Sequence, residues 1–393
     1  MKKLFYEDAH MTTFSAIVTE CLYDEKKNVY KIVLDQTAFF PEEGGQVADK
    51  GTLTFVDEEK TVHTFPLLDA HIKEDIIYHY VEKEIPIGTV VTGEVDWEQR
   101  FDFMQQHTGE HIISGLVNRY FGFDNVGFHL GLQEVTLDFN GTLSLEQLRK
   151  IEQKANEAIW KNLPIEISYP IAEALQSLVY RSKLDITENV RIVTIPGYDV
   201  CACCAPHVDS TGQIGIIKIT NVQSHRGGVR VNILCGKRAL NDYTVKQDNA
   251  ATISASLSVK QDLISNGVER LKEENFKQKE MINTLQANIL NQLATTLPAP
   301  AESSHAVLFV EPMDDIAIRN LINELVPKYS GYVGVFWGND TDGYRYIVGS
   351  STLDCRDLAA TLREKFNAKG GGKAPMIQGT ILATKEQIKT IIY

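Results

Sequence analysis

The chain has 393 residues, of which 43% are hydrophobic and 23% charged, a composition typical of a folded protein with several domains. Its net charge of −13 argues against a general nucleic-acid binder, although one local basic face is compatible with it. No apolar run approaches the length of about 18 residues that spans a membrane, and the start MKKLFYEDAH lacks the apolar core of a signal peptide. The six cysteines, three of them at 201, 203 and 204, suit a reducing compartment, so we expect a cytoplasmic protein without a membrane partner.

Residues 1–92 are expected to form a small β-barrel or closed sheet. Short runs rich in β-branched and aromatic residues alternate there with charged or glycine-containing turns, which is the pattern of strands joined by tight connections. The runs are FSAIVTECLYD (14–24), NVYKIVLDQTAFF (28–40), KGTLTFVDE (50–58) and TVHTFPLLD (61–69).

A long helix is expected to follow the barrel. Asp96 is a favourable N-cap with Gln99 three positions later, and Gly122 is a favourable stop after Phe121. The residues predicted to share one inward face are Phe103, Met104, His107, His111 and Gly115.

A second helix is expected from Ser144, where Gln147 completes a capping box, to a point before Pro164. Its predicted buried residues are Leu148, Ile151, Ala155 and Ile159. Strands are predicted at 126–139, 190–195, 213–220 and 228–234. Together, residues 93–242 are expected to form one α+β domain.

Two pairs of metal-binding residue types share one spacing in this domain. His107 and His111 stand in HTGEH, and Cys203 and His207 stand in CCAPH. On a helix, an i, i+4 pair lies on one face, close enough to hold the same ion. Three imidazoles and a thiolate suit zinc better than magnesium or calcium, which prefer oxygen ligands. The spacing predicts a zinc site, and burial of the same residues in an ordinary core is the alternative.

Residues 243–297 are expected to be helical, since they contain no proline and only one glycine, Gly267. Most heptad core positions are apolar, which favours a coiled coil and makes this segment the candidate interface of a homodimer. A bend at Gly267 between two antiparallel helices is the alternative. The sequence LPAP at 297–300 then predicts a linker.

Residues 303–393 alternate strand and helix patterns and form the basic end of the chain. The last 49 residues carry eight Lys/Arg against four Asp/Glu. A glycine run in KGGGKAPMIQG (369–379) would let the backbone approach a phosphate, although no Ser or Thr follows the lysine as in a Walker loop. The candidate phosphate-contacting residues are Lys369, Gly370, Gly371, Gly372 and Lys373. A solvated basic face is the alternative.

Four motifs together resemble one protein family. TAFFPEEGGQVADKG (37–51), HTGEH and CCAPHVDSTGQIG (203–215) resemble the editing domain of alanyl-tRNA synthetase and its free-standing relatives, the AlaX proteins. KGGGKAPMIQG resembles the signature of the DHHA1 domain, which closes alanyl-tRNA synthetase. The sequence begins at the expected barrel and contains no Asp-His-His, so the resemblance implies the long AlaX type without an aminoacylation domain. Gly109-Glu110 and Cys204-Ala205-Pro206 depart from the family's usual residues.

The resemblance implies a multidomain α+β chain of four parts. These are a β-barrel domain (1–92), a zinc-binding editing domain (93–242), a helical or coiled-coil segment (243–297) and an α/β DHHA1-like tRNA-binding domain (303–393).

The implied activity is zinc-dependent hydrolysis of the ester that joins serine, or glycine, to the 3′ end of alanine-type tRNA. The metal bound by His107, His111, Cys203 and His207 would polarise the ester carbonyl, activate water or bind the substrate's amino group. An ester is already reactive, so positioning and modest polarisation suffice.

Several further residues are candidates for substrate contact. Thr37 is the candidate for the serine hydroxyl, because a site that hydrogen-bonds a hydroxyl rejects an analogue without one. Gln46, after Gly44 and Gly45, is the candidate for orienting water or the ester, and ordinary turn chemistry is the alternative. His129 is expected on a strand facing the same core, either as a structural or as a functional residue.

Two other classes of function compete with this one. HTGEH also fits H-x-x-E-H, the inverted zincin motif, in which Glu110 would be the general base of a peptidase and Glu188 a further ligand. That interpretation gives no role to CCAPH, to Gly44-Gly45-Gln46 or to the basic C-terminal part. Four protein ligands would also suit a closed, structural zinc in an RNA-binding module.

Overall fold

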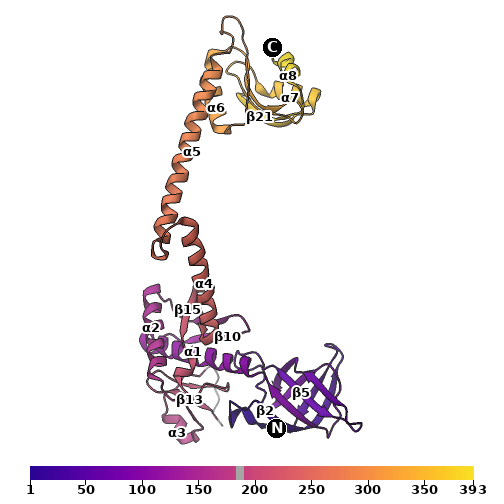
Figure 1. Ribbon diagram of the computed structural model, residues 1–393, viewed down its shortest axis with the longest axis vertical. Coiled ribbons are helices and arrows are strands. Elements are labelled where there is room, and N and C mark those ends of the chain that lie inside the picture. Colours follow the sequence, from indigo (N-terminus) through magenta and orange to yellow (C-terminus); the bar gives the residue numbers. More distant parts are fainter. Residues whose placement is uncertain (183–189) are drawn as a thin grey trace. The chain divides into compact units, whose positions relative to one another are not determined.

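The computed structural model describes residues 1–182 and 190–393, and these form two compact units, Met1–Asn249 and Ala250–Tyr393 (Figure 1). Helices alternate with several separate sheets, so the expected mixed α+β class is confirmed. None of the helices in the described ranges is long and apolar enough to cross a membrane.

The first unit begins with a curled, seven-stranded antiparallel sheet (Figure 1). Its strands, in the order β6-β5-β9-β2-β3-β8-β7, bury alternate residues in one core. Strand β2 pairs with β9 through its first half and with β3 through its second half, which joins the two sides of the sheet. The strands are β2 (Thr13–Asp24), β3 (Val29–Leu34), β5 (Gly51–Val56), β6 (Val62–Pro66), β7 (Asp69–Lys73), β8 (Ile76–Val81) and β9 (Val90–Val95). The four predicted runs each contain a strand.

A separate two-stranded parallel sheet contacts β2 of this sheet. Strand β1 (Lys2–Lys3) pairs with β4 (Gln36–Thr37), and a 3-10 turn, η1 (Leu4–Tyr6), follows β1. Residues 38–40, directly after β4, are fully buried in the same core.

Helix α1 (Trp97–Phe121) begins and ends where the sequence predicts. The Asp96 side chain accepts a hydrogen bond from the Gln99 backbone N–H, and Gly122 closes the helix with φ 69°. Residues 103–117 are all buried, so the helix is covered on every side rather than on the single predicted face. It packs against α2 (Leu145–Lys161), β14 (Asp199–Ala202) and β16 (Gly228–Cys235).

A four-stranded antiparallel sheet, ordered β10-β11-β16-β15, covers part of α1. The single strand predicted at 126–139 is wrong: it is a hairpin of β10 (Asn125–Leu130) and β11 (Val135–Phe139), closed by a hydrogen bond from Gly131 N–H to Glu134 O. The strand predicted at 213–220 begins later, as β15 (Ile217–His225), because residues 211–214 form the 3-10 turn η2 (Thr211–Ile214) and Gly215 has φ 81°.

Helix α2 has the predicted capping box of Ser144 and Gln147, and it buries Leu148, Ile151, Ala155 and Ile159 as expected. Beyond it, β12 (Glu166–Ser168), β13 (Ile192–Ile195) and β14 form a three-stranded antiparallel sheet, and the short helix α3 (Ala172–Ser177) lies between β12 and β13 in sequence. Strand β14 was not predicted, and it leads directly into the CCAPH segment.

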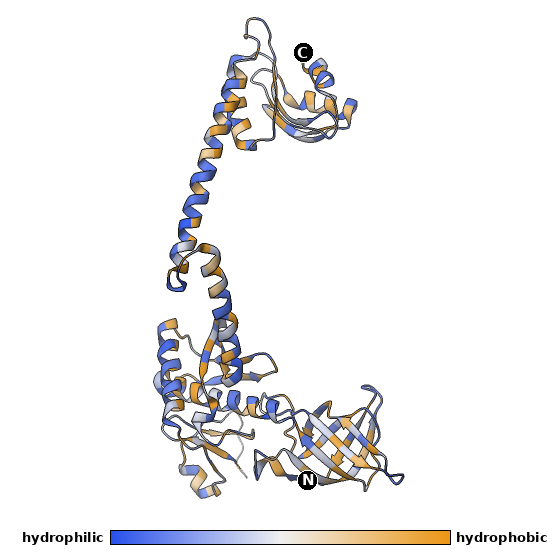
Figure 2. Cartoon of the chain, viewed as in Figure 1, coloured by the Kyte–Doolittle hydropathy of each residue, from blue (hydrophilic) through white to orange (hydrophobic). Residues whose placement is uncertain are grey.

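The predicted helical stretch is two helices, α4 (Gly236–Leu257) and α5 (Ile264–Ala294), with the 3-10 turn η3 (Gln261–Leu263) between them. The break begins at Ser258, which has φ 52°, and not at Gly267 as the two-helix alternative placed it. Gly267 is instead buried on α5, where an added Cβ would lie 3.2–3.3 Å from Leu257 and Val259. Figure 2 shows a largely hydrophilic α5 with single hydrophobic residues along it, of which Val268, Leu271, Ile282, Leu285 and Ile289 are exposed.

The rest of the second unit is a five-stranded sheet, ordered β17-β18-β19-β21-β20, with helices on both faces. Helix α6 and the end of α5 pack on one face, whereas α7 and α8 pack on the other. The strands are β17 (Ala306–Val310), β18 (Val333–Asn339), β19 (Gly343–Gly349), β20 (Lys369–Lys373) and β21 (Met376–Ile381). The helices are α6 (Asp315–Leu325), the 3-10 turn η4 (Val326–Lys328), α7 (Cys355–Phe366) and α8 (Lys385–Ile392).

The glycine run of this unit forms an edge strand. Strand β20 pairs with β21 on one side only and is mostly exposed. A Cβ at Gly370 or Gly372 would lie 2.2 or 2.3 Å from a β21 carbonyl oxygen, so these glycines allow the two strands to approach closely.

Candidate metal centre

The structure brings His107, His111, Cys203 and His207 together. One ligand atom from each of these four residues lies within 4.8 Å of the others. The Cys203 Sγ is 3.5 Å from His107 Nε2 and 3.4 Å from His207 Nε2. In a tetrahedral site with zinc-like bond lengths, sulfur and nitrogen ligands are about 3.6 Å apart. The four side chains therefore have the donor types and the spacing that a tetrahedral metal ion requires.

Two elements present these four side chains. The two α1 histidines lie one helical turn apart, as their spacing predicts. Cys203 and His207 lie in the irregular segment after β14 rather than on a helix. Arg191, just before β13, holds this segment: it accepts a hydrogen bond from Cys203 N–H and donates from Nη1 to the carbonyl oxygens of Cys203 and Ala205.

Each histidine is also held through its other ring nitrogen. His107 Nδ1 lies 2.9 Å from Gln46 Oε1, and His207 Nδ1 lies 3.0 Å from Thr108 Oγ1. His111 Nδ1 lies 2.9 Å from Asp199 Oδ2. All three imidazoles therefore turn Nε2 toward Cys203 or the shared centre.

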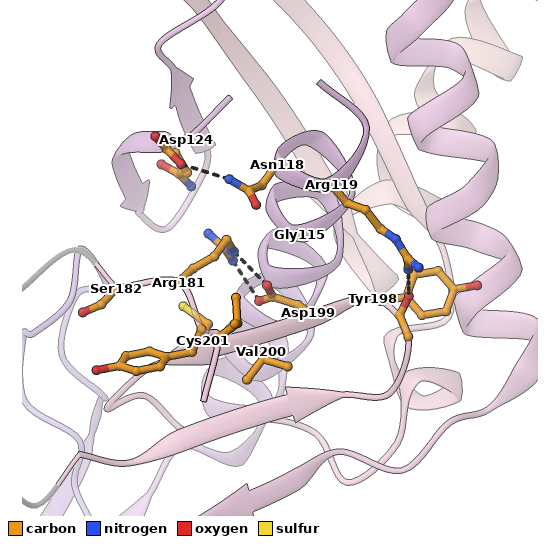
Figure 3. Close-up of a pocket in the computed structure, with 14 residues that line it drawn as sticks. Gly115, Asn118, Arg119, Asp124, Arg181, Ser182, Tyr198, Asp199, Val200 and Cys201 are labelled. Carbon is orange, nitrogen blue, oxygen red and sulfur yellow. Dashed lines mark hydrogen bonds and ion pairs between the residues drawn. The ribbon is translucent and has the colours of Figure 1, made fainter. Parts of the chain in front are cut away.

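Asp199 is fixed from behind by an ion pair (Figure 3). Arg181 donates from Nε to Oδ1 at 2.7 Å and from Nη2 to Oδ2 at 2.8 Å. Both residues line a cavity of about 600 Å³, together with Gly115, Asn118, Arg119 and Cys201. Burial opposes ionisation of Asp199, but Arg181 and His111 hold the pKa of its carboxyl below the usual value.

The electrostatics of the cluster favour a thiolate. Burial opposes ionisation of Cys203, but the neighbouring His107, His207 and His111 hold the pKa of its thiol well below the usual value. Burial lowers the pKa of His207 to about 3, so this imidazole is neutral. A thiolate and neutral imidazoles are the forms in which these side chains bind a metal. Burial opposes protonation of His111, but the neighbouring Cys201, Cys203 and Asp199 raise its pKa well above the usual value, so binding of a metal would release a proton from this imidazole.

The two glycines before Gln46 have a conformational role. Gly44 and Gly45 have φ 62° and 84°, which favour glycine. A Cβ at Gly45 would lie 2.4 Å from Phe128 O, and one at Gly44 would lie 3.3 Å from Cys204 Sγ. The pair lets the segment pass closely between β10 and the CCAPH segment, so that Gln46 reaches His107.

Thr37 lies in the barrel core with no exposed surface. Its Oγ1 lies 2.9 Å from His79 Nε2 and accepts a hydrogen bond from Phe39 N–H at 3.1 Å. His79 is also fully buried, and burial lowers its pKa to about 4. The described hydrogen bonds of Thr37 therefore go to the barrel and not to the four clustered side chains.

His129 lies on a strand, β10, as expected, but it is exposed, so the expectation that it faces the core is wrong. Successive side chains point to opposite faces of a strand, and the preceding Phe128 takes the inner position. The Phe128 ring contacts the His107 ring, with centroids 4.9 Å apart. The other sequence-predicted contacts, Lys369–Lys373, lie in the second unit.

Glu110 is buried beside the cluster. Its Oε1 accepts hydrogen bonds from Ser114 Oγ and Asn125 Nδ2, both at 2.6 Å, and its Oε2 lies 3.8 Å from His111 Nε2. Glu188, the further ligand of the peptidase alternative, lies outside the described residues.

Sequence reasoning missed Thr108, Arg181, Arg191 and Asp199. Thr108 stands inside HTGEH, so the imidazole spacing gave the only available signal for it. Asp199 is 88 residues from the histidine that it contacts, and no local spacing connects the two.

Comparison with known proteins gives two family matches. Residues 190–231 match the threonyl and alanyl tRNA synthetase second additional domain, and residues 2–99 match the class II (A) tRNA synthetases. The first match contains Cys203 and His207, and the second contains the Gly-Gly-Gln segment.

Whole-chain relatives extend this likeness. The alanine–tRNA ligase of Ignicoccus hospitalis is 27% identical over 98% of the chain, that of Pyrobaculum neutrophilum 30% over 100%, and that of Methanopyrus kandleri 30% over 95%. The chain is alanyl-tRNA-synthetase-like along almost its whole length. It spans 42–44% of the length of these alanine–tRNA ligases.

Proposed function

We propose that the chain is a zinc-dependent hydrolase that edits in trans, removing serine, and glycine as a second substrate, from mischarged alanine-type tRNA. The observation that carries the proposal is the convergence of His107, His111, Cys203 and His207. The likeness to alanine–tRNA ligases supports alanine-type tRNA as the partner, and we place the activity in the cytoplasm.

The four clustered side chains would hold zinc, which supplies Lewis-acid polarisation of the ester or activation of a water. Cys203 contributes the thiolate, and its charge reduces that of the bound ion. Phe128 against His107 and the buried surroundings of α1 exclude bulk water from this side of the ligands.

Thr37 is the proposed selectivity residue. His79 Nδ1 faces the Ile32 carbonyl oxygen at 3.1 Å, so Nδ1 carries the proton and Nε2 accepts the proton of the Thr37 hydroxyl. Thr37 Oγ1 then offers a lone pair, which suits the donating hydroxyl of serine and has no counterpart in alanine. Because Thr37 has no exposed surface, this recognition requires the substrate to displace the segment that covers it.

The second unit is the proposed contact for the tRNA body. Trp337, Arg345, Thr380 and Lys369 are paired in register across four neighbouring strands. The Arg345 guanidinium lies 5.1 Å from the Trp337 ring centroid, and both Lys369 and Lys373 are exposed on the edge strand. The two lysines on this exposed edge strand suit a phosphate backbone. The exposed apolar residues of α5 support a homodimer through 243–297.

The test is incubation of the metal-loaded protein with seryl-, glycyl- and alanyl-tRNA of the alanine type. We expect release of serine and sparing of alanine, and no release from the variant His107→Ala. A casein digest tests the peptidase alternative, and zinc binding without any deacylation would favour the structural-zinc alternative. The engaged Oε1 of Glu110 gives the peptidase interpretation no additional support.

A further inference from the structure

The Nδ1 atoms of the three clustered histidines, which point away from the candidate metal, all bond to side-chain oxygens. The pairs are His107–Gln46 at 2.9 Å, His111–Asp199 at 2.9 Å and His207–Thr108 at 3.0 Å. Whether each bond fixes the imidazole tautomer depends on whether its oxygen can only accept a hydrogen bond.

Thr108 can only accept from His207. Its hydroxyl donates its single proton to the Met104 carbonyl oxygen, one helical turn earlier, at 2.7 Å. A hydroxyl has one proton and two lone pairs, so the bond to His207 must use the Nδ1–H as donor. The proton of His207 is thereby fixed on Nδ1, and Nε2 carries the lone pair.

Asp199 can only accept from His111. Both of its carboxylate oxygens face the Arg181 guanidinium, which donates to them at 2.7 and 2.8 Å. A carboxylate has no proton to give, so His111 Nδ1–H is the donor here too. Arg181 in turn keeps the carboxylate in one orientation, since its two-pronged geometry matches both oxygens.

Gln46 presents its amide oxygen to His107. Its backbone is fixed by two reciprocal hydrogen bonds with Glu43, each 3.1 Å long, and the following Val47 N–H bonds to the Leu130 carbonyl oxygen. The sequence pattern suggested that Gln46 orients water or the ester. In the structure its side-chain carbonyl oxygen lies 2.9 Å from His107 Nδ1, and because a carbonyl oxygen carries no proton, His107 Nδ1–H is the donor here as well.

We infer that Gln46, Thr108 and Asp199 are positioning residues of the metal centre, which hold all three imidazoles in the tautomer that leaves Nε2 for the ion. The inference rests on the proposed function only in assigning a metal to the four ligands. It gives the Gly-Gly-Gln segment a task in metal binding, since Gln46 comes from the barrel side of the unit whereas the ligands come from α1 and the segment after β14. It also makes Arg181 part of the centre, because Arg181 orients Asp199.

The test measures metal binding and not hydrolysis. The full-length variants Gln46→Met, Thr108→Val and Asp199→Asn remove one acceptor or its charge with little change in size. Zinc affinity is measured by competition with a chromogenic chelator, and ligand geometry by the visible absorption of the cobalt-substituted protein. Loss of such a partner typically weakens metal affinity by about 10–100-fold, and we expect each variant to fall in that range with an altered cobalt spectrum.

Matched controls separate positioning from general destabilisation. Thr211→Val removes another buried hydroxyl that donates to a helix carbonyl, that of Ala158, and Asp138→Asn breaks another carboxylate–arginine pair, with Arg230. Both controls are expected to bind zinc as the unchanged protein does. Thr108→Ser keeps the hydroxyl and is expected to restore both affinity and spectrum, even if Thr108→Val unfolds.

The inference would be overturned if all three variants bound zinc within about twofold of the controls and kept their cobalt spectrum. It would also be overturned if Thr108→Ser failed to restore the affinity and the spectrum. A protein that binds zinc with these dependences but releases no serine from tRNA contradicts the proposed function and leaves the positioning roles intact.

Discussion

Thr37 and His79 share a 2.9 Å hydrogen bond inside the barrel, and neither side chain has exposed surface. The Thr37 hydroxyl donates its proton to the neutral His79 imidazole, so its oxygen can only accept further hydrogen bonds. In the sequence alone, Thr37 could equally be an ordinary turn residue. The same bond makes Thr37 part of the barrel's stability, because its loss leaves both His79 Nε2 and Phe39 N–H without their partner.

Thr37→Val is therefore expected to have two separable effects. Unpartnered buried groups lower the free energy of unfolding by about 1–3 kcal/mol. If Thr37 also tests for the serine hydroxyl, hydrolysis of alanyl-tRNA should rise about tenfold relative to seryl-tRNA, the value of one hydrogen bond. Rates are compared at a temperature at which the variant is fully folded, and Thr19→Val, which removes another barrel hydroxyl, is the control. An unchanged serine-to-alanine ratio would leave Thr37 with a structural role only.

If the four clustered side chains bind one zinc ion together, removal of two of them should abolish binding. The variant Cys203→Ala with His207→Ala removes two of four, and two remaining histidines do not hold zinc against a chelator. The zinc content after dialysis should fall from near one equivalent per chain to near zero, as measured by elemental analysis. Cys204→Ala is the matched control, because Cys204 is the neighbouring thiol and is absent from the cluster. Full retention of zinc in the double variant contradicts the four-ligand site.

His79 should make stability depend on pH. Burial lowers its folded pKa from 6.5 to about 4, so between these values the unfolded chain binds a proton that the folded protein does not. Stability is therefore complete above pH 6.5 and falls as the pH drops toward 4, by about 3 kcal/mol in total. Urea unfolding of the unchanged protein and of His79→Gln should differ in slope over this window. An identical dependence of stability on pH in the unchanged protein and in His79→Gln would exclude His79 as the cause.

The basic edge of the second unit should set the salt dependence of tRNA binding. Lys369→Gln with Lys373→Gln in the full-length chain is expected to weaken binding and to reduce the slope of log affinity against log salt by about two, one for each phosphate contact. Lys277→Gln with Lys279→Gln on α5 removes the same charge from another exposed surface as a control. If both variants showed the same slope of log affinity against log salt, Lys369 and Lys373 would have no special part in tRNA binding. The net negative charge of the chain would then be the better predictor of its affinity for RNA.

Self-association should follow the exposed apolar residues of α5. Replacing Leu271 and Leu285 by Lys puts charges at two of them, which are 54% exposed in the single chain. If a homodimer forms through this helix, sedimentation should show a shift toward monomer. Removal of residues 298–393 should instead leave self-association unchanged, and a dimer that persists in the Lys variant but is lost on truncation would place the interface elsewhere.

The sequence predicts the local elements of this fold well, because each has a chemical signal at its ends. Asp96 and Gly122 bound α1, and Ser144 with Gln147 begins α2, as read from the residues alone. The hairpin at 131–134 was missed because apolar alternation continues on both sides of its turn. The break at Ser258 carries no glycine or proline, so the only visible candidate was Gly267, which packs against the break instead.

The clustering of the four side chains was predictable from the sequence, whereas their hydrogen-bond partners were not. The pairs His107/His111 and Cys203/His207 have local spacings that name a chemistry. Gln46 lies 61 residues from His107, and Asp199 lies 88 from His111, so these contacts exist only after the chain has folded. The glycine run was a local signal for close backbone approach to a phosphate, and the sequence did not show that the same residues form a strand paired with β21.

Cys203 and His107 are 96 residues apart, and an ion held by both would act as a clip across that length of chain. Closing a long loop removes more freedom from an unfolded chain than closing a short one, which is why such clips stabilise most when their ends are distant. During synthesis, His107 and His111 on α1 are made first, and Cys203 and His207 follow only after all the elements from β10 to β14 have been made. The chain would therefore acquire its ion late in synthesis, and the availability of zinc at that moment would influence how much of the protein reaches the folded state.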